Sequence, residues 1–208
     1  MIDCSQYKQM IFDVDGVIFD SNALKADNIR SAAAEFVSRQ EAEKFTEWFT
    51  GLNGIPREIK VHKWFADKRT AEGILESYTR RNEETLYEVA FTAGARQLLE
   101  TASESHELIA LSGGEVGEVR TLFERRGIRS YFREVLGGPK TKQENLAPVT
   151  LHHPLLYVGD SRIDYECAAE IGADFVFMAA YTQFSGWQSY FAGETGVRII
   201  QTLEELRP

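Results

Sequence analysis

Short apolar runs, each about as long as one buried strand, recur along the chain and constrain its fold more than any other feature. Five of them lack the polar alternation of a half-exposed strand, and they cover residues 10–12, 108–111, 155–158, 175–178 and 197–200, with a weaker candidate at residues 134–136. Helical patterns lie between several of these runs, over residues 95–103, 115–126 and 164–171. Strands that alternate with helices indicate a parallel sheet with helices on both faces. We therefore expect an α/β fold with a doubly wound parallel sheet.

The interval of residues 21–90 differs because it contains helical patterns and no convincing strand. Residues 23–49 carry Ala, Leu, Phe and Trp at helical spacing, residues 51–56 interrupt the pattern, and residues 57–68 and 70–87 resume it. The alternation of strand and helix returns near Phe91. We expect a Rossmann-like core formed by residues 1–20 and 91–208, with an all-helical cap domain of residues 21–90 inserted after the first strand.

Composition excludes several classes of partner. The formal net charge of -9 argues against electrostatic binding to nucleic acid or to an anionic membrane. No run approaches the ~18 apolar residues of a membrane span, and the first residues lack the pattern of a signal peptide. Cys4 and Cys167 lie outside any CxxC or Cys/His cluster, which favours free thiols in a reducing compartment. We expect a cytoplasmic protein with no nucleic-acid or membrane partner.

Two carboxylates, Asp13 and Asp15, follow the first apolar run and precede Gly16. Ligands of open α/β sheets bind beyond the carboxyl ends of the strands. Two carboxylates at such a position repel each other unless a cation or a proton offsets their charge. A solvated Asp-Gly turn would explain the same residues, so this motif alone does not establish a site.

Polar residues also follow the second and third strong runs. Ser112 and Gly113 come after residues 108–111, where a hydroxyl and backbone N–H groups near a helix start can hold a phosphate or simply cap the helix. Asp160 and Asp164 come after residues 155–158. Helix capping would explain Asp164, but it explains Asp160 less well. These segments should share one edge of the sheet.

Two lysines, Lys140 and Lys142, lie on a loop expected at the same edge of the sheet. At least one of them is expected to be an ordinary surface lysine. Lys142 is the better candidate for a site residue because it opens a short helical stretch over residues 141–146.

In order, these segments resemble the four motifs of the haloacid dehalogenase superfamily, and the similarity spans the whole chain. The matching motifs are DVDGV with Asp13 and Asp15, LSGG with Ser112, TK with Lys142, and GDSRID with Asp160 and Asp164. The helical insertion resembles the helical cap of the phosphatase branch, which includes phosphoglycolate phosphatases and β-phosphoglucomutase-like proteins. The resemblance implies a hydrolase that removes phosphate from small phosphorylated metabolites.

The resemblance also implies a role for each carboxylate. Asp13 would be the nucleophile that forms an aspartyl-phosphate, and Asp15 would be the general acid/base. Mg²⁺ would bind to Asp13, Asp160 and Asp164, directly or through water, and to the backbone carbonyl of Asp15. Because dehalogenases of the family lack an aspartate two residues after the nucleophile, Asp15 favours phosphate chemistry over carbon–halogen cleavage.

Phosphate contacts are implied for Ser112, Gly113 and Lys142, and Lys142 would also stabilise the charge on Asp13. Arg57 resembles an arginine of the related sugar phosphomutases that contacts a distal phosphate or another anionic group of the substrate. A surface arginine at a helix start explains Arg57 equally well. Asn22 and Lys25 follow the first connection and could also reach the mouth of the site, although a lysine at such a position is more often a solvated helix residue.

Two enzymatic hypotheses remain open. The leading one is a Mg²⁺-dependent phosphatase of small metabolites, and the alternative is a sugar phosphomutase of the β-phosphoglucomutase type, which shares every core residue. A non-catalytic binding module is disfavoured because Asp13, Asp15 and the lysine are all present. Neither the physiological substrate nor the choice between monomer and homodimer follows from the sequence.

Overall fold

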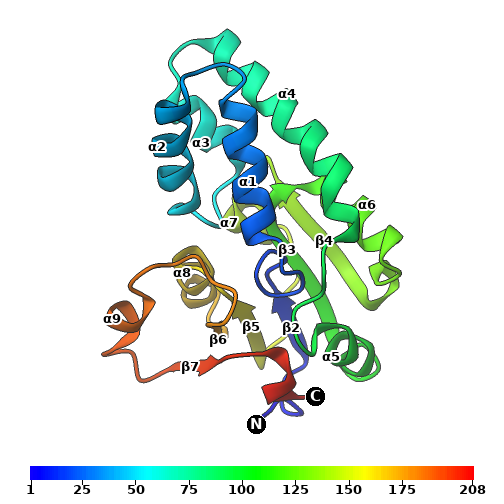
Figure 1. The fold of residues 1–208 in the computed structure, drawn as a ribbon. Coiled ribbons are helices and arrows are strands. Elements are labelled where there is room, and N and C mark those ends of the chain that lie inside the picture. The colour runs from blue at the N-terminus through cyan, green and yellow to red at the C-terminus, as the bar shows by residue number, and fades with distance from the viewer.

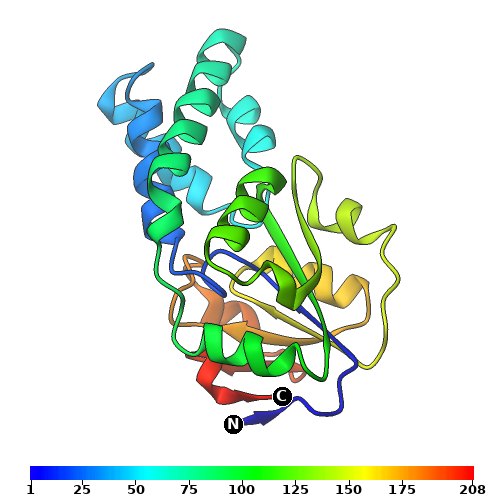
Figure 2. The ribbon, with the colours of Figure 1, turned by 90° about the vertical axis from the view of Figure 1, so that its right-hand side faces the viewer.

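A six-stranded parallel sheet forms the centre of the protein, and the computed structural model describes all residues, 1–208. The strand order is β4-β3-β2-β5-β6-β7 (Figure 1). The strands are β2 (Gln9–Phe12), β3 (Glu107–Glu115), β4 (Phe132–Gly138), β5 (Leu155–Gly159), β6 (Asp174–Met178) and β7 (Val197–Ile200). Two further short strands, β1 (Ile2–Asp3) and β8 (Leu206–Arg207), pair in parallel and hold the two termini side by side (Figure 2).

The central strand β2 lies between β3 and β5, and successive side chains of β2 point to opposite faces of the sheet. Phe12 is level with Ala110 of β3 on one side and with Val158 of β5 on the other. Met10 and Phe12 pack into one hydrophobic cluster, whereas Ile11 packs into another. This alternation is the period of two expected for a strand buried on both faces.

Helices cover both faces of the sheet. Helices α5 (Ala95–Ala102) and α6 (Val116–Arg125) pack into the first cluster, and α7 (Lys142–Leu146), α8 (Arg162–Glu170) and α9 (Trp187–Phe191) pack into the second. In this strand order the chain leaves β2 toward β3 and later returns to β5 on its other side, so the carboxyl ends of β2 and β5 lie at a topological switch point. The expected doubly wound α/β fold is confirmed.

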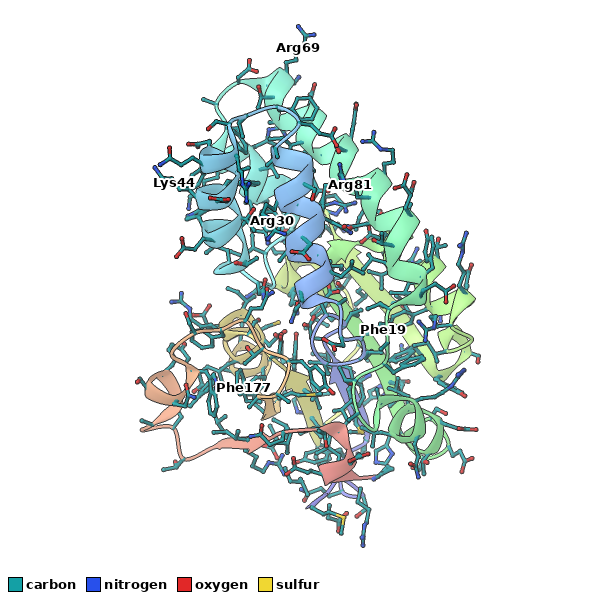
Figure 3. The ribbon with its side chains drawn as sticks, in the orientation of Figure 1. Phe19, Arg30, Lys44, Arg69, Arg81 and Phe177 are labelled. Carbon is teal, nitrogen blue, oxygen red and sulfur yellow. The ribbon has the colours of Figure 1, made fainter.

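Four α-helices between β2 and α5 form a bundle beyond the carboxyl edge of the sheet (Figures 1 and 2). They are α1 (Asn22–Ala33), α2 (Arg39–Thr50), α3 (Arg57–Trp64) and α4 (Lys68–Thr85), followed by the short 3₁₀ helix η1 (Leu86–Glu88). The bundle has a hydrophobic cluster of its own, which includes Ile29, Phe45 and Ile74. On its outer surface Lys44 and Arg69 point away from the sheet (Figure 3).

Two segments of the chain connect the sheet to the bundle, and they lie against each other. The backbone N–H of Asp20 donates to the carbonyl of Ala90 over 2.9 Å, and Phe19 forms an antiparallel bridge with Phe91. The rings of Phe19 and Phe91 have their centroids 4.8 Å apart. Figure 3 shows Phe19 at this junction. Residues 19–20 and 90–91 therefore form one hydrogen-bonded pair of connections, which we call the crossing.

Most of the predicted strands and helices are present with small changes at their ends. The helical pattern predicted over residues 23–49 is in fact two helices, α1 and α2, because the backbone leaves the helix before Ser38 and the Ser38 hydroxyl caps α2 by accepting from the N–H of Glu41. Strand β3 continues to Glu115, beyond its apolar run. No helix is long and apolar enough to span a membrane.

Candidate active site

Three buried carboxylates converge at the switch point. Asp13 comes directly after β2, Asp160 directly after β5, and Asp164 lies in the first turn of α8. One oxygen from each lies within 4.8 Å of the others. The sequence brings them together because parallel strands end at one edge of the sheet and α8 begins there. The side chain of Asp15 is not one of the three, and the expected contribution of its backbone carbonyl to a metal stays a prediction.

Lys142 is the cation among these carboxylates. Its Nζ lies 2.6 Å from Asp13 Oδ1 and 2.5 Å from Asp164 Oδ1, and its side chain is fully buried. Burial lowers the pKa of Lys142, but Asp13 and Asp164 raise it by more, so the pKa lies above its usual range and the side chain stays charged. Lys140 is exposed. Of the two lysines considered from the sequence, the structure brings only Lys142 to the site.

Negative charge still exceeds positive charge among these groups. Burial raises the pKa of Asp13, Lys142 opposes the rise, and nearby Asp164 and Asp15 add to it, so that the pKa lies at about 7. Burial, with Asp13 and Asp164, also raises the pKa of Asp160 well above its usual range. One ammonium is therefore too little charge for three buried carboxylates, and a divalent cation would supply what is missing.

The individual oxygens differ in how free they are. Asp13 Oδ1 accepts from Lys142, and Asp160 Oδ2 accepts from Asn22 Nδ2 over 2.9 Å, but the other oxygen of each accepts no hydrogen bond from the protein. Asp164 is more fully used: Oδ1 accepts from Lys142 and from the Tyr157 hydroxyl, and Oδ2 accepts from the N–H and hydroxyl of Ser161. The oxygen-only donor set fits Mg²⁺, which is bound by few carboxylates and keeps several waters. Asp13 and Asp160 each keep one oxygen that accepts no hydrogen bond from the protein.

Asp15 lies in the same cavity but has a different environment. Lys25 Nζ is 2.6 Å from Asp15 Oδ1, the Ser21 hydroxyl donates to the same carboxylate, and the Ser112 hydroxyl lies 3.5 Å from Oδ2. Burial raises the pKa of Asp15, but the ion pair with Lys25 and the hydrogen bonds from Lys25 and Ser21 outweigh it, and the pKa lies below its usual value. Of the two roles considered for Lys25, the solvated one is wrong and the one at the mouth of the site is correct, because α1 points Lys25 at Asp15.

Ser112 and Gly113 directly follow the apolar run of residues 108–111, as expected, but they lie within β3 and not after it. Ser112 is fully buried, and its hydroxyl accepts from the N–H of Gly114. It does not cap the following helix, because Glu115 does so by accepting from the N–H groups of Gly117 and Glu118. The N–H groups of Gly117 and Glu118 are thus already engaged and are not free to hold a phosphate.

The bundle reaches the site through its loop between α2 and α3. A Cβ at Gly113 would lie 2.9 Å from the backbone of Gly54, and a Cβ at Gly54 would lie 2.9 Å from Ile163 Cβ. Gly54 also has a φ of 86°, which disfavours any other residue. Glycine at both positions lets the two backbones touch, so the loop closes directly over the ends of the strands.

Arg57, at the start of α3, is buried and faces the α6 residue Glu118. Its Nη1 lies 3.0 Å from Glu118 Oε2, which also accepts from Asn82 of α4, and Lys25 lies 3.9 Å from Glu118 Oε1. Arg57, Lys25 and Glu118 line the cavity that contains Asp13 and Asp15. The structure therefore brings Arg57 to the site and gives it a carboxylate partner. Its predicted contact with a substrate is a separate matter and stays a prediction.

Sequence reasoning missed Glu118 and the buried Lys60, which both line the cavity. Both lie on helices with the spacing of ordinary amphipathic surfaces, and nothing local distinguishes them from solvated residues. Only the position of the bundle over the sheet turns them inward.

Comparison with known proteins agrees with this geometry. Residues 10–178 match the family model described as haloacid dehalogenase-like hydrolase. The chain is 28% identical over 189 residues to a phosphoglycolate phosphatase of Mannheimia succiniciproducens, covering 81% of this chain and 84% of that protein. It is 26% identical over 188 residues to a phosphoglycolate phosphatase of Haemophilus influenzae, with the same shares covered.

Solved structures show the same fold. A predicted phosphatase from Clostridium acetobutylicum matches with a TM-score of 0.74 at 16% identity, covering 93% of this chain and 94% of that one. A haloacid dehalogenase-like family protein from Streptococcus pneumoniae matches with a TM-score of 0.68 at 16% identity, covering 96% and 97%. The family model spans most of the chain, and the superfamily expected from the motifs is confirmed. The chain belongs to the haloacid dehalogenase-like hydrolases.

Proposed function

We propose that this protein is a Mg²⁺-dependent phosphatase of small phosphorylated metabolites that works through an aspartyl-phosphate on Asp13. The observation that supports this most directly is the environment of Asp13. One of its oxygens is held by Lys142, and the other makes no hydrogen bond with the protein in the cavity where Asp15 also lies. A nucleophile needs one such free oxygen and a fixed orientation.

Asp13, Asp160 and Asp164 would hold the cation, together with the backbone carbonyl of Asp15. Asp13 would do so through Oδ1, which Lys142 also contacts, so that its other oxygen stays free to react. When bound, Mg²⁺ would neutralise charge that otherwise keeps the Asp13 carboxylate and an anionic phosphate apart. Since Asp164 Oδ1 and Oδ2 each already accept two hydrogen bonds, Asp164 would contact the cation through a water molecule.

The proposal also includes the division of the chain into a core of residues 1–20 and 91–208 and a cap of residues 21–90. The cap would exclude water from the cavity.

In the first step the free oxygen of Asp13 attacks the phosphorus, the bond to the leaving oxygen breaks, and Asp15 gives that oxygen a proton. In the second step water attacks the phosphorus of the aspartyl-phosphate, Asp15 takes the proton of the water, and inorganic phosphate leaves. Lys25 favours the carboxylate form of Asp15 that the second step needs. An arriving phosphate adds negative charge beside Asp15, which favours the protonated form that the first step needs.

Ser112, Gly113 and Lys142 would hold the oxygens of the transferred phosphoryl group. Ser112 lies beside Asp15, and Lys142 beside Asp13, so both flank the point where the phosphorus must sit. Arg57 would meet the rest of the substrate. Its Nη2 makes no hydrogen bond with the protein, although Nη1 is engaged by Glu118. The same phosphatase activity is named for the relatives from Mannheimia and Haemophilus.

The test is hydrolysis of p-nitrophenyl phosphate by the wild type and by Asp13→Asn, each with Mg²⁺ and with a chelator. We expect turnover only for the wild type with Mg²⁺, and acid quenching during turnover should trap a protein heavier by one phosphoryl group. Asp20→Asn, which removes an exposed carboxylate, is the matched control and should keep full activity. Mg²⁺-dependent turnover that survives Asp13→Asn would refute the assignment of the nucleophile.

A phosphomutase would behave differently in one respect. It would isomerise a sugar phosphate while releasing inorganic phosphate only slowly. Incubation with hexose phosphates, followed by phosphorus-31 NMR, separates the two activities.

A further inference from the structure

The cavity between the sheet and the bundle has carboxylates on its sheet side and cations on its bundle side. The bundle contributes Lys25, Arg57 and Lys60. Lys25 is paired with Asp15, and Arg57 is paired with Glu118. Lys60 has no such partner, because no carboxylate oxygen lies within 4.0 Å of its Nζ.

Lys60 lies on α3 and is only 5% exposed. Its Nζ donates to the carbonyl of Phe49 over 3.2 Å and sits 3.5 Å from the centroid of the Phe49 ring. Burial and the charge on Lys25 lower the pKa of Lys60, Asp15 and Glu58 oppose them only in part, and the pKa lies at about 7. A buried ammonium that lacks a counter-charge is costly, and such groups are normally paired.

The contact with Phe49 explains part of this arrangement. The carbonyl of Phe49 belongs to the last turn of α2, and a cation there caps the helix. That contact uses one of the three donors of the ammonium and supplies no negative charge. It also does not explain why the side chain lines the cavity of Asp13 instead of reaching solvent, as lysine usually does.

We infer that Lys60 binds a second anionic group of the substrate, so that the preferred substrates are phosphomonoesters whose alcohol portion carries a carboxylate or a second phosphate. This inference rests on the proposed phosphatase function. The transferred phosphoryl group would occupy the sheet side of the cavity at Asp13, and the second anion would occupy the bundle side at Lys60. Lys60 would thus be a specificity-determining residue, and Arg57 beside it, paired with Glu118 through Nη1, would contact the rest of the substrate only through Nη2.

Three substrates that differ only at one end test the inference. They are 3-hydroxypropyl phosphate, 3-phosphooxypropanoate and propane-1,3-diyl bisphosphate, which carry a neutral hydroxyl, a carboxylate and a second phosphate. We expect the wild type to favour one or both anionic compounds over the neutral one by about ten- to hundredfold in kcat/KM, the range for a hydrogen bond to a charged group. The more favoured compound identifies the anion.

The variants are Lys60→Met and Lys60→Arg, with Lys63→Met as control because Lys63 lies exposed on the same helix. Lys60→Met should lower kcat/KM on the anionic compounds by about ten- to hundredfold, mainly through KM, and bring it close to the value for the neutral compound. Lys60→Arg should keep part of the preference, and Lys63→Met all of it. Thermal melting of each variant shows whether it is folded.

Two results would overturn the inference. One is a wild type that hydrolyses all three compounds equally well. The other is a Lys60→Met variant that loses activity equally on all three compounds, as expected if the lysine only caps α2. In either case hydrolysis of the neutral compound by the wild type still supports the phosphatase function, whereas that function fails if no compound is hydrolysed.

Discussion

Replacing the proposed nucleophile should stabilise the metal-free protein. The carboxylate of Asp13 has a pKa of about 7 in the fold against an ordinary value of 3.8, chiefly because it is buried. Each tenfold change in an ionisation constant corresponds to about 1.4 kcal/mol, so full ionisation of Asp13 costs the folded state up to about 4 kcal/mol. Asparagine has nearly the same shape and carries no charge. The pKa of about 7 already includes the attraction of Lys142, so we expect a gain of about 2 to 4 kcal/mol in Asp13→Asn, less than the full value where asparagine hydrogen-bonds less well than a protonated carboxyl.

The sign of the pH dependence follows from the same values. Because the pKa is raised in the folded state, the folded protein binds more protons than the unfolded chain between pH 3.8 and about 7. The wild type therefore loses stability relative to Asp13→Asn as the pH rises through this window. The difference is absent below the window and constant above it.

Urea unfolding in the presence of a chelator measures this difference, at about pH 5 and about pH 8 for both proteins. Asp13→Asn should have the higher free energy of unfolding at both values, with the larger gain at the higher pH. Asp20→Asn, which changes the net charge equally at an exposed position, should show no such gain. A variant no more stable than the wild type at the higher pH would refute the reasoning, as would a gain that does not depend on pH.

Three further changes have definite outcomes. Lys142→Met leaves the buried carboxylates without their cation, and urea unfolding should show a loss of about 3 to 5 kcal/mol at neutral pH. Lys25→Met removes the ion pair that lowers the pKa of Asp15, so a carbon-13 NMR titration should place the ionisation of that carboxyl at a higher pH than in the wild type. Gly16→Ala puts a Cβ at a φ of 78° into the side chains of Asn22 and Asp160, so it should lower the melting temperature and weaken Mg²⁺ binding in calorimetry. The cost should exceed about 1 kcal/mol, whereas Gly193→Ala, whose Cβ meets nothing within 4 Å, should cost much less.

The sheet and the group around Asp13 could be predicted because they depend on local patterns and one topological rule. An apolar run predicts a strand, and parallel strands with carboxylates after them bring those carboxylates to one edge. Asp13, Asp160, Asp164 and Lys142 follow this rule and meet in the structure. The division of residues 23–49 into two helices also has a local signal, the Ser38 and Glu41 pair that starts α2, which helical periodicity alone does not contain.

The residues on the bundle side could not be predicted in the same way. Whether Lys25 or Lys60 is solvated or buried depends on how the four helices pack over the sheet. The spacing of apolar residues along one helix does not determine that packing. Glu118 is similar, since it belongs to the core helix α6 but gains its partners, Arg57 and Asn82, from the bundle. Partner choice across two packed units is a property of tertiary structure alone.

The crossing at Asp20 and Ala90 gives the acid/base group a mechanical link to the bundle. Ser21, which donates to Asp15, and Asn22, which donates to Asp160, follow Asp20 immediately, and Lys25 lies one helical turn further along α1. Because the two connections are hydrogen-bonded to each other, Ser21, Asn22 and Lys25 would move together if the bundle rotated about the crossing. The low pKa of Asp15 therefore depends on the position of α1 over the sheet, because Lys25 lies on α1 and Ser21 directly precedes it.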